Sequence, residues 1–196
     1  MAIKIEYPER ATPLDPDEAE GLLPEHIETK RELNEWEQQN ILEGERWAFA
    51  QKRDDLLTVD FMFQLHKALF GNTWRWAGKI RGTEKNIGLD PARIESEMKA
   101  LCKDVAAQLG HESYSLDEIA TRFHHRLVAI HPFSNGNGRF SRTMADLLLV
   151  GFGAERFTWG RGDLVAAGEV RNRYLEALRA ADAKNYAPLL AFVRSG

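Results

Sequence analysis

The sequence predicts an all-α fold, and three observations support this prediction. After residue 29, apolar residues recur at helical spacing through most of the chain. Two of these stretches follow pairs that suit capping boxes, Thr29 with Glu32 and Ser115 with Glu118. Only residues 74–88 lack a helical period and show short apolar pieces around a turn. We therefore expect one helical domain that contains one small β-hairpin.

The chain begins with a proline-rich segment. Prolines stand at positions 8, 13, 16 and 24 among acidic residues, and proline disfavours a helix because it fixes φ and lacks an N–H donor. A chain of 196 residues has room for one well-buried core. We therefore divide it into an extended N-terminal arm at 1–28 and a single domain at 29–196.

About seven helices are expected in this domain. Residues 29–52 form one or two helices, with a kink near Gly44 as one alternative, and Thr58 begins a helix that ends at 71–72. Further helices cover 94–109, the stretch after Ser115 and the stretch after Arg139. The last two helices are expected at 164–181 behind Asp163 and at 186–194 behind Asn185.

The composition favours a protein of the cytoplasm. The formal net charge of −4 argues against binding nucleic acid through bulk electrostatics. Cys102 is the only cysteine, so no intrachain disulfide is expected and a reducing compartment is favoured. The first residues lack the apolar core of a signal peptide, and no apolar run is long enough to span a bilayer.

The segment HPFSNGNGR at 131–139 has the pattern of a phosphate-binding loop. Pro132 ends the preceding helix, while Gly136 and Gly138 allow backbone N–H groups to turn inward where the next helix begins. Arg139 and Arg142 share one face of that helix and can reach one polyphosphate. Spacing alone leaves a simple turn between helices open as the alternative.

His131 is the side chain of this segment that is best suited to accept a proton near neutral pH. His124 and His125 precede it, but they point to different sides of a helix and no carboxylate has ligand-like spacing, so we expect packing and hydrogen bonding there. Aromatic and basic residues at 74–81 offer a second function, stacking on single-stranded nucleic acid, which we consider unlikely.

The pattern HPFxxGNGRxxR at 131–142 resembles the signature of the Fic family, whose members mostly transfer AMP from ATP to Ser, Thr or Tyr hydroxyls of proteins. Further similar patterns follow in the family's order: LH at 65–66, WAGxxR at 76–81, RFHHxL at 122–127 and YxxAL at 174–178. The resemblance covers roughly residues 33–194 and is greatest to the subgroup called mobile mystery protein B.

The resemblance implies the role of each motif residue. His131 would be the general base, Asn137 would hydrogen-bond near the α-phosphate, and Phe133 would anchor the loop in the core. The implied nucleotide-binding residues are Asn135, Gly136, Asn137, Gly138, Arg139 and Arg142. The implied substrates are ATP and a protein that carries an acceptor hydroxyl.

The expected hairpin at 81–88 resembles the Fic flap, which pairs with an extended segment of the target protein. Its target-docking residues would be Thr83, Glu84, Lys85, Asn86 and Ile87. A structural turn is the alternative interpretation.

Asn135 departs from the family pattern, in which Asp or Glu holds Mg²⁺ at this position. A neutral amide is a poorer ligand for Mg²⁺. Three outcomes follow: the nucleotide holds Mg²⁺ with Asn135 as a weak or water-mediated ligand, another nucleotide-derived group is transferred, or the protein binds a nucleotide or partner without transfer. We favour the first because His131 and both arginines are present.

Fic proteins are often inhibited by a glutamate that pairs with the second arginine of the motif, here Arg142. Glu43 is a candidate, but Gln39 stands where the inhibitory pattern has Ser or Thr. Inhibition by a separate antitoxin-like chain is therefore a further hypothesis. The sequence does not predict an oligomeric state.

Overall fold

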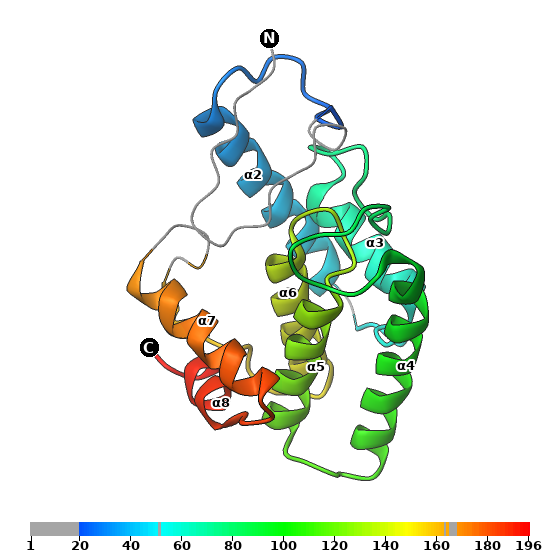
Figure 1. The fold of residues 1–196 in the computed structure, drawn as a ribbon, viewed down its shortest axis with the longest axis vertical. Coiled ribbons are helices and arrows are strands. Elements are labelled where there is room, and N and C mark those ends of the chain that lie inside the picture. Colours follow the sequence, from blue (N-terminus) through cyan, green and yellow to red (C-terminus); the bar gives the residue numbers. More distant parts are fainter. Residues whose placement is uncertain (1–19, 51, 163, 165–167) are drawn as a thin grey trace.

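The computed structural model describes residues 20–50, 52–162, 164 and 168–196. Seven α-helices form this part, together with the short 3₁₀ helix η1 at Trp159–Arg161 (Figure 1). The α-helices are α2 at Lys30–Phe49, α3 at Val59–Phe70, α4 at Pro91–Gly110, α5 at Leu116–Ile130, α6 at Asn137–Gly151, α7 at Glu169–Asp182 and α8 at Ala187–Val193. The predicted all-α fold is confirmed.

The helix starts follow from local sequence. The side chain of Thr29 accepts a hydrogen bond from the Glu32 N–H and the Glu32 side chain reaches back, which is the predicted capping box. Thr58 and Ser115 cap α3 and α5 through their side-chain oxygens. The predicted second capping box is only half formed, because the Glu118 carboxylate accepts from Arg122. The predicted cap residue Asp163 lies outside the described residues, and Leu164 is not helical; α7 begins at Glu169.

The core lies around α3, α5 and α6. Figure 1 shows α5 and α6 side by side at the centre, with the pair α7 and α8 on one side and α4 on the other. Helix α6 is buried on nearly all sides, because nine of its residues from Phe140 to Leu149 have an exposed fraction of 5% or less. A helix that is apolar or small on most sides is suited to this central position. The loop between α5 and α6 is thereby attached to a deeply buried helix.

Gly44 does not break α2, which runs as one helix from Lys30 to Phe49. A Cβ atom at Gly44 would lie 2.6 Å from the backbone oxygen of Ala68 in α3. The glycine therefore allows the two helix backbones to approach closely. The helix has no break near Gly44, and the absence of a side chain at this position serves helix packing.

Residues 21–23 pack against the segment that follows α3. An isolated β-bridge joins Leu22 and Trp74, and the Leu23 N–H donates to the carbonyl of Thr73 at 2.9 Å. This part of the predicted arm is extended and lies on the domain. Residues 1–19 of the arm lie outside the described residues.

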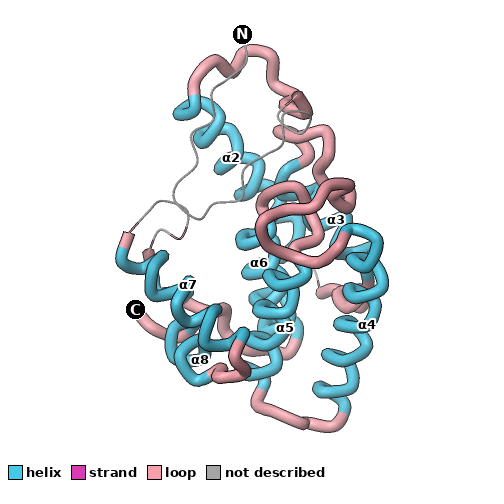
Figure 2. The backbone as a smooth tube through the Cα atoms, in the orientation of Figure 1, coloured by secondary structure: helices cyan, strands magenta, loops and turns pink. Residues whose placement is uncertain are grey.

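The predicted β-hairpin at 81–88 is wrong in its secondary structure. Figure 2 shows this segment as loop, and the described residues form no strand there. The Arg81 side chain donates to the carbonyls of Thr83, Leu89 and His131, so it holds both ends of the segment in place of a strand ladder. We call residues 82–88 the flap loop. None of the described helices is long and apolar enough to span a membrane.

Candidate active site

The loop between α5 and α6 turns sharply at two residues with left-handed backbone. His131 is the cap residue after α5, with φ 52° and ψ 61°, and Gly136 is the cap residue before α6, with φ 75°. Pro132 follows His131 and prevents α5 from continuing. The predicted loop-to-helix arrangement of residues 131–142 is therefore formed at the centre of the domain.

The loop is anchored from the inside by Phe133. Its ring is fully buried and stacks on the His66 ring with centroids 3.7 Å apart, and Phe140 packs against its edge. Burial of an aromatic ring of this size contributes about 2–3 kcal/mol. This confirms the predicted role of Phe133 as a core anchor and ties the loop to α3.

His66 has a larger role than the sequence indicated. It is fully buried in α3, its Nδ1 accepts the Gly78 N–H at 2.9 Å, and its Nε2 lies 3.0 Å from the Asn135 carbonyl oxygen. Because Nδ1 accepts, the proton is on Nε2 and is donated to Asn135. Burial lowers the pKa of His66 to about 3, so the ring is neutral at pH 7. His66 thus fixes the backbone of the motif loop.

The start of α6 leaves donors for an anion. Gly136 provides no side-chain cap, and the first intrahelical bond runs from the Phe140 N–H to the Gly136 carbonyl. The N–H groups of the preceding turn, including those of Gly138 and Arg139, therefore have no acceptor within the helix. Together with the helix dipole, they form a binding site for a negatively charged group.

Asn137 is hydrogen-bonded within the loop. Its Oδ1 accepts the Phe133 N–H at 3.0 Å, its Nδ2 donates to the Phe133 carbonyl at 2.8 Å, and the residue is only 3% exposed. The expected hydrogen bond of Asn137 near the α-phosphate stays a prediction. The two hydrogen bonds to Phe133 hold the loop in shape.

Asn135 offers a metal ion a single neutral side-chain oxygen. This Oδ1 accepts the Gly136 N–H at 2.6 Å, which uses one of its two lone pairs. Within the described ranges, no three His, Cys, Asp or Glu side chains are grouped to hold a metal ion. Mg²⁺ prefers carboxylates in proteins. The residues present therefore do not fit a metal that the protein holds by itself.

Arg139 is oriented by two neighbours. Its guanidinium lies 5.2 Å from the centre of the Phe70 ring, and its Nη2 lies 3.3 Å from the Glu37 carboxylate of α2. Glu37 also accepts the Trp74 Nε1–H at 2.6 Å. Trp74 is 3% exposed and stacks on Trp76, so the Trp74 ring packs within the protein.

His131 is placed as a neutral base at the edge of this anion site. The residue is 6% exposed. Burial and the charge of Arg81 lower the pKa of its imidazole, a backbone hydrogen bond with Val128 opposes them, and the resulting pKa is about 4. The ring is therefore neutral at pH 7, which is the form that can accept a proton.

The flap loop lies directly beside His131. The Arg81 N–H donates to the Pro132 carbonyl, the Leu89 N–H donates to the Ile130 carbonyl, and a Cβ atom at Gly88 would lie 2.6 Å from the His131 Cβ. Four of the five predicted docking residues are exposed, namely Thr83, Glu84, Asn86 and Ile87, and Lys85 is partly exposed. The flap loop thus combines anchored ends with an exposed middle next to the base.

Glu43 is directed away from Arg142. Its carboxylate accepts from Gln39 Nε2 at 2.9 Å and from Asn72 Nδ2 at 3.4 Å. The structure therefore does not support Glu43 as the residue that inhibits Arg142.

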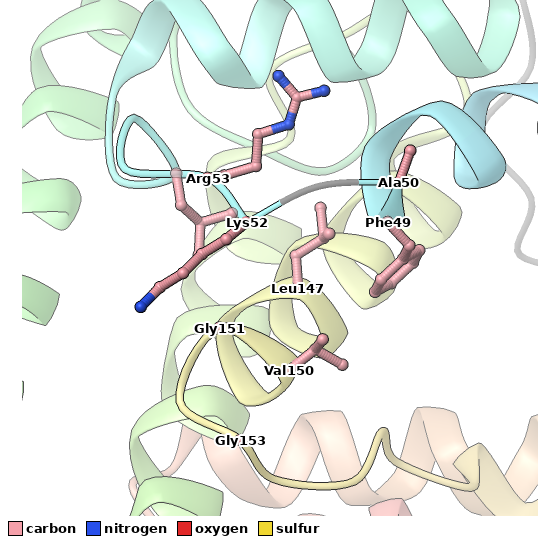
Figure 3. A pocket seen from close by; sticks show the side chains of 9 residues that line it. Phe49, Ala50, Lys52, Arg53, Leu147, Val150, Gly151 and Gly153 are labelled. Carbon is pink, nitrogen blue, oxygen red and sulfur yellow. The ribbon is translucent and has the colours of Figure 1, made fainter.

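A hollow of about 420 Å³ lies elsewhere on the molecule, between the ends of α2 and α6 (Figure 3). Its lining residues are Phe49, Ala50, Lys52, Arg53, Leu56, Leu147, Val150, Gly151 and Gly153. The site at Asn137 is at the opposite end of α6, and fifteen helical residues span roughly 20 Å. The hollow is therefore separate from the candidate active site.

Replacing Gly136 with alanine should destabilise the protein by roughly 2–5 kcal/mol. A residue with a side chain costs about 1–2 kcal/mol in the left-handed region, and overpacking a core adds about 1–3 kcal/mol. Both apply, because φ is 75° and the new Cβ would lie 2.5 Å from the Phe70 ring. Urea denaturation measures the loss. Gly151→Ala, whose Cβ meets no atom within 4 Å, is the control, and equal stability of the two variants would contradict the prediction.

The fold and the site together define a helical domain whose central loop is suited to bind phosphate groups beside a neutral histidine. Residues 56–149 match the model of the Fic/DOC family. The chain belongs to this family.

Known relatives and solved structures agree with this assignment. Protein adenylyltransferase fic-1 of Caenorhabditis elegans is 30% identical over 151 residues, which are 74% of this chain and 28% of that protein. The N-terminal Fic domain of a putative cell filamentation protein from Bartonella quintana superposes with a TM-score of 0.70 at 20% identity, over 86% of this chain and 84% of that one. The AMPPNP-bound BepC protein of Bartonella tribocorum gives a TM-score of 0.68 at 18% identity, over 92% and 97%. At these identities the two structures establish the fold alone.

Proposed function

We propose that this chain is a protein adenylyltransferase that transfers AMP from ATP to a Ser, Thr or Tyr hydroxyl of a target protein. The observation that carries the proposal is a neutral, buried histidine beside the anion site of α6, with an anchored flap loop next to it. The family relationship supports the same reaction, since the fic-1 relative is named for it. This chain spans 28% of that relative's length, so the activity of the chain itself must be measured directly.

In the proposed reaction, the acceptor hydroxyl oxygen attacks the α-phosphorus of ATP. His131 takes the hydroxyl proton, a phosphodiester bond forms to the acceptor, and the bond between the α-phosphorus and the bridging oxygen breaks to release pyrophosphate. The N–H groups at the start of α6 and the guanidinium groups of Arg139 and Arg142 bind the phosphates that leave.

The flap loop would align the target segment. Its ends are fixed by Arg81, whose side chain donates to three carbonyls, while residues 83–87 face solvent in whole or part. An extended target segment that pairs with exposed backbone needs little sequence specificity. This supports a protein substrate in preference to a small-molecule acceptor.

Label transfer tests the proposed function. The protein is incubated with a cell lysate, Mg²⁺ and ATP labelled either at the α- or at the γ-phosphate. We expect the α-label on a protein band and no γ-label, because pyrophosphate is the leaving group. Transfer of the γ-label alone would indicate a kinase-type reaction, and absence of both labels despite nucleotide binding would refute the transferase proposal.

A binding protein without transfer is the second candidate, and Asn135 is the observation that favours it. Its amide oxygen is engaged by the Gly136 N–H, so the residues present leave Mg²⁺ to the phosphates of the nucleotide and to water. The transferase proposal remains compatible with this arrangement. ATP would bring its own Mg²⁺, so no step of the proposed reaction depends on a metal that the protein holds.

Asn135→Asp should raise Mg²⁺-dependent transfer by on the order of tenfold, which corresponds to about 1.4 kcal/mol of added stabilisation. The carboxylate supplies a charged ligand where the amide supplies a neutral one. Initial rates are measured across a Mg²⁺ titration, and the Mg²⁺ concentration for half-maximal rate should fall. Ser134→Asp, at the neighbouring buried loop position, is the control for added charge. A variant that binds ATP but still shows no transfer would favour the binding protein.

A further inference from the structure

Arg142 differs from Arg139 in its partners. Arg139 pairs with Glu37, whereas no carboxylate in the described part of the chain forms an ion pair with Arg142. The Arg142 side chain is partly buried, and its Nη1 would lie 3.4 Å from a Cβ atom at Gly138, so it faces the start of α6. A partly buried cation without a counter-ion is costly unless other groups stabilise it. The Arg142 guanidinium can therefore bind an anion, and neutral polar groups must stabilise it when no anion is bound.

Tyr174 of α7 is the neutral partner. The guanidinium carbon of Arg142 lies 6.0 Å from the centre of the Tyr174 ring, and the charge of Arg142 opposes the rise in the Tyr174 pKa that burial causes. Tyr174 is 5% exposed, and its hydroxyl lies 2.9 Å from Nε2 of the fully buried His124 in α5. Three helices, α5, α6 and α7, thus contribute one side chain each to a row that ends at Arg142.

The direction of the hydrogen bond between Tyr174 and His124 follows from the charge beside it. The positive guanidinium of Arg142 favours the negative end of the phenol dipole on its side, so the Tyr174 O–H is directed away from Arg142 and donated to His124 Nε2. His124 must then accept at Nε2, which requires a neutral ring. Burial, together with the nearby charge of Arg142, lowers the pKa of His124 to about 3, so the ring is neutral at pH 7. Burial also raises the pKa of Tyr174, which keeps the phenol protonated.

We propose that Tyr174, oriented by His124, is a positioning residue. It directs the Arg142 guanidinium toward the β- and γ-phosphates of the bound nucleotide. The inference rests on the proposed function, because it assumes a nucleoside triphosphate at the start of α6. A neutral phenol holds the cation without cancelling its charge, whereas a carboxylate would compete with the phosphate. The effect of Tyr174 on nucleotide affinity should therefore depend on the number of phosphates that the nucleotide carries.

The test compares ATP with AMP by calorimetry on the full chain. Tyr174→Phe keeps the buried ring but removes the hydroxyl. We expect its Kd for ATP to rise about tenfold while its Kd for AMP stays within about twofold. Tyr186→Phe is the matched control, because the Tyr186 hydroxyl lies 3.2 Å from Nδ1 of His125, the next residue of α5. This control should leave both Kd values unchanged.

A second pair of variants tests the row from its other end. His124→Gln can keep an acceptor for the Tyr174 hydroxyl and should retain ATP affinity, whereas His124→Leu removes the acceptor and should weaken ATP binding as Tyr174→Phe does. Equal losses for ATP and AMP, or unchanged ATP affinity in Tyr174→Phe, would overturn the inference. Wild-type protein that binds AMP and ATP but transfers no label would contradict the proposed function while leaving the inference intact.

Discussion

Replacing His131 with alanine is expected to reduce AMP transfer by about 10²–10⁴-fold, the range that general bases contribute. The imidazole is neutral because burial and the Arg81 charge lower its pKa to about 4, so nearly every wild-type molecule carries the active form at pH 7. The substitution removes the proton acceptor without removing the N–H groups of α6 or the two arginines. The loss should therefore appear in the rate of transfer and not in the Kd for ATP.

Backbone strain must be separated from this chemical effect. His131 has φ 52°, a region where alanine costs about 1–2 kcal/mol and where asparagine is tolerated better. His131→Asn is therefore measured beside His131→Ala in single-turnover assays with α-labelled ATP, with thermal unfolding as the stability control. If the two variants lose the same amount of transfer activity although their stabilities differ, the loss is due to the missing base. Residual transfer above about one tenth of wild type would exclude His131 as the general base.

The helices could be predicted because their signals are local. Thr29, Thr58 and Ser115 cap helices as expected, since a side-chain oxygen two or three residues before free N–H groups works in any surroundings. The motif loop was also predictable, because proline and glycine restrict backbone in known ways. The order of helix, loop and helix around residues 131–142 follows from these rules.

The contacts that shape the site could not be predicted in this way, because they join residues far apart in the sequence. His66 reaches Asn135 across 69 positions, and Glu37 reaches Arg139 across 102. A histidine on the apolar face of the helix at 59–70 was the only local signal for the first contact. The two hydrogen bonds between the Asn137 amide and Phe133 have no local signal either, because the position of that amide depends on the turn that the whole loop makes around Phe133.

The hairpin prediction failed because the Arg81 side chain makes the hydrogen bonds that a pair of strands would make between their backbones. Short apolar pieces around a turn suit a hairpin, but Arg81 donates to the carbonyls of Thr83, Leu89 and His131 and remains 2% exposed. A guanidinium has five N–H donors in a fixed plane and can satisfy several carbonyls at once. The segment is therefore held at its ends without cross-strand pairing.

Acidification from pH 7 to about 4.5 is expected to destabilise the protein strongly, because burial lowers the pKa of three histidines and two of these cannot accept a proton without losing a contact. His66 is the clearest case. Its Nδ1 accepts the Gly78 N–H, so a proton on Nδ1 would break that bond and place a charge beside Phe133. His124 at Nε2 has the same restriction toward Tyr174. Protonation of either ring therefore opposes the folded state of the motif loop and its surroundings.

The direction of the effect follows from the pKa values. Burial lowers the pKa of His66 and His124 to about 3 and that of His131 to about 4, against about 6.5 in an unfolded chain. Between these values the unfolded chain binds more protons, so the free energy of unfolding falls as the pH falls. Each histidine contributes about 1.4 kcal/mol per pH unit, and three give roughly 8 kcal/mol between pH 6.5 and 4.5, comparable with a total stability of about 5–15 kcal/mol.

Urea unfolding at pH 7, 6 and 5, followed by circular dichroism, measures this dependence. His66→Asn should reduce the slope of the unfolding free energy against pH by about one third, since one of three proton acceptors is removed. Gln64→Asn, at an exposed position of α3, is the matched control and should keep the wild-type slope. The slopes are compared, and not the unfolding free energies themselves, because His66→Asn also lowers the unfolding free energy at every pH by loosening the contact with Asn135. A wild-type protein equally stable at pH 7 and pH 5, or a slope unchanged by His66→Asn, would show that His66 titrates freely and does not lock the motif loop.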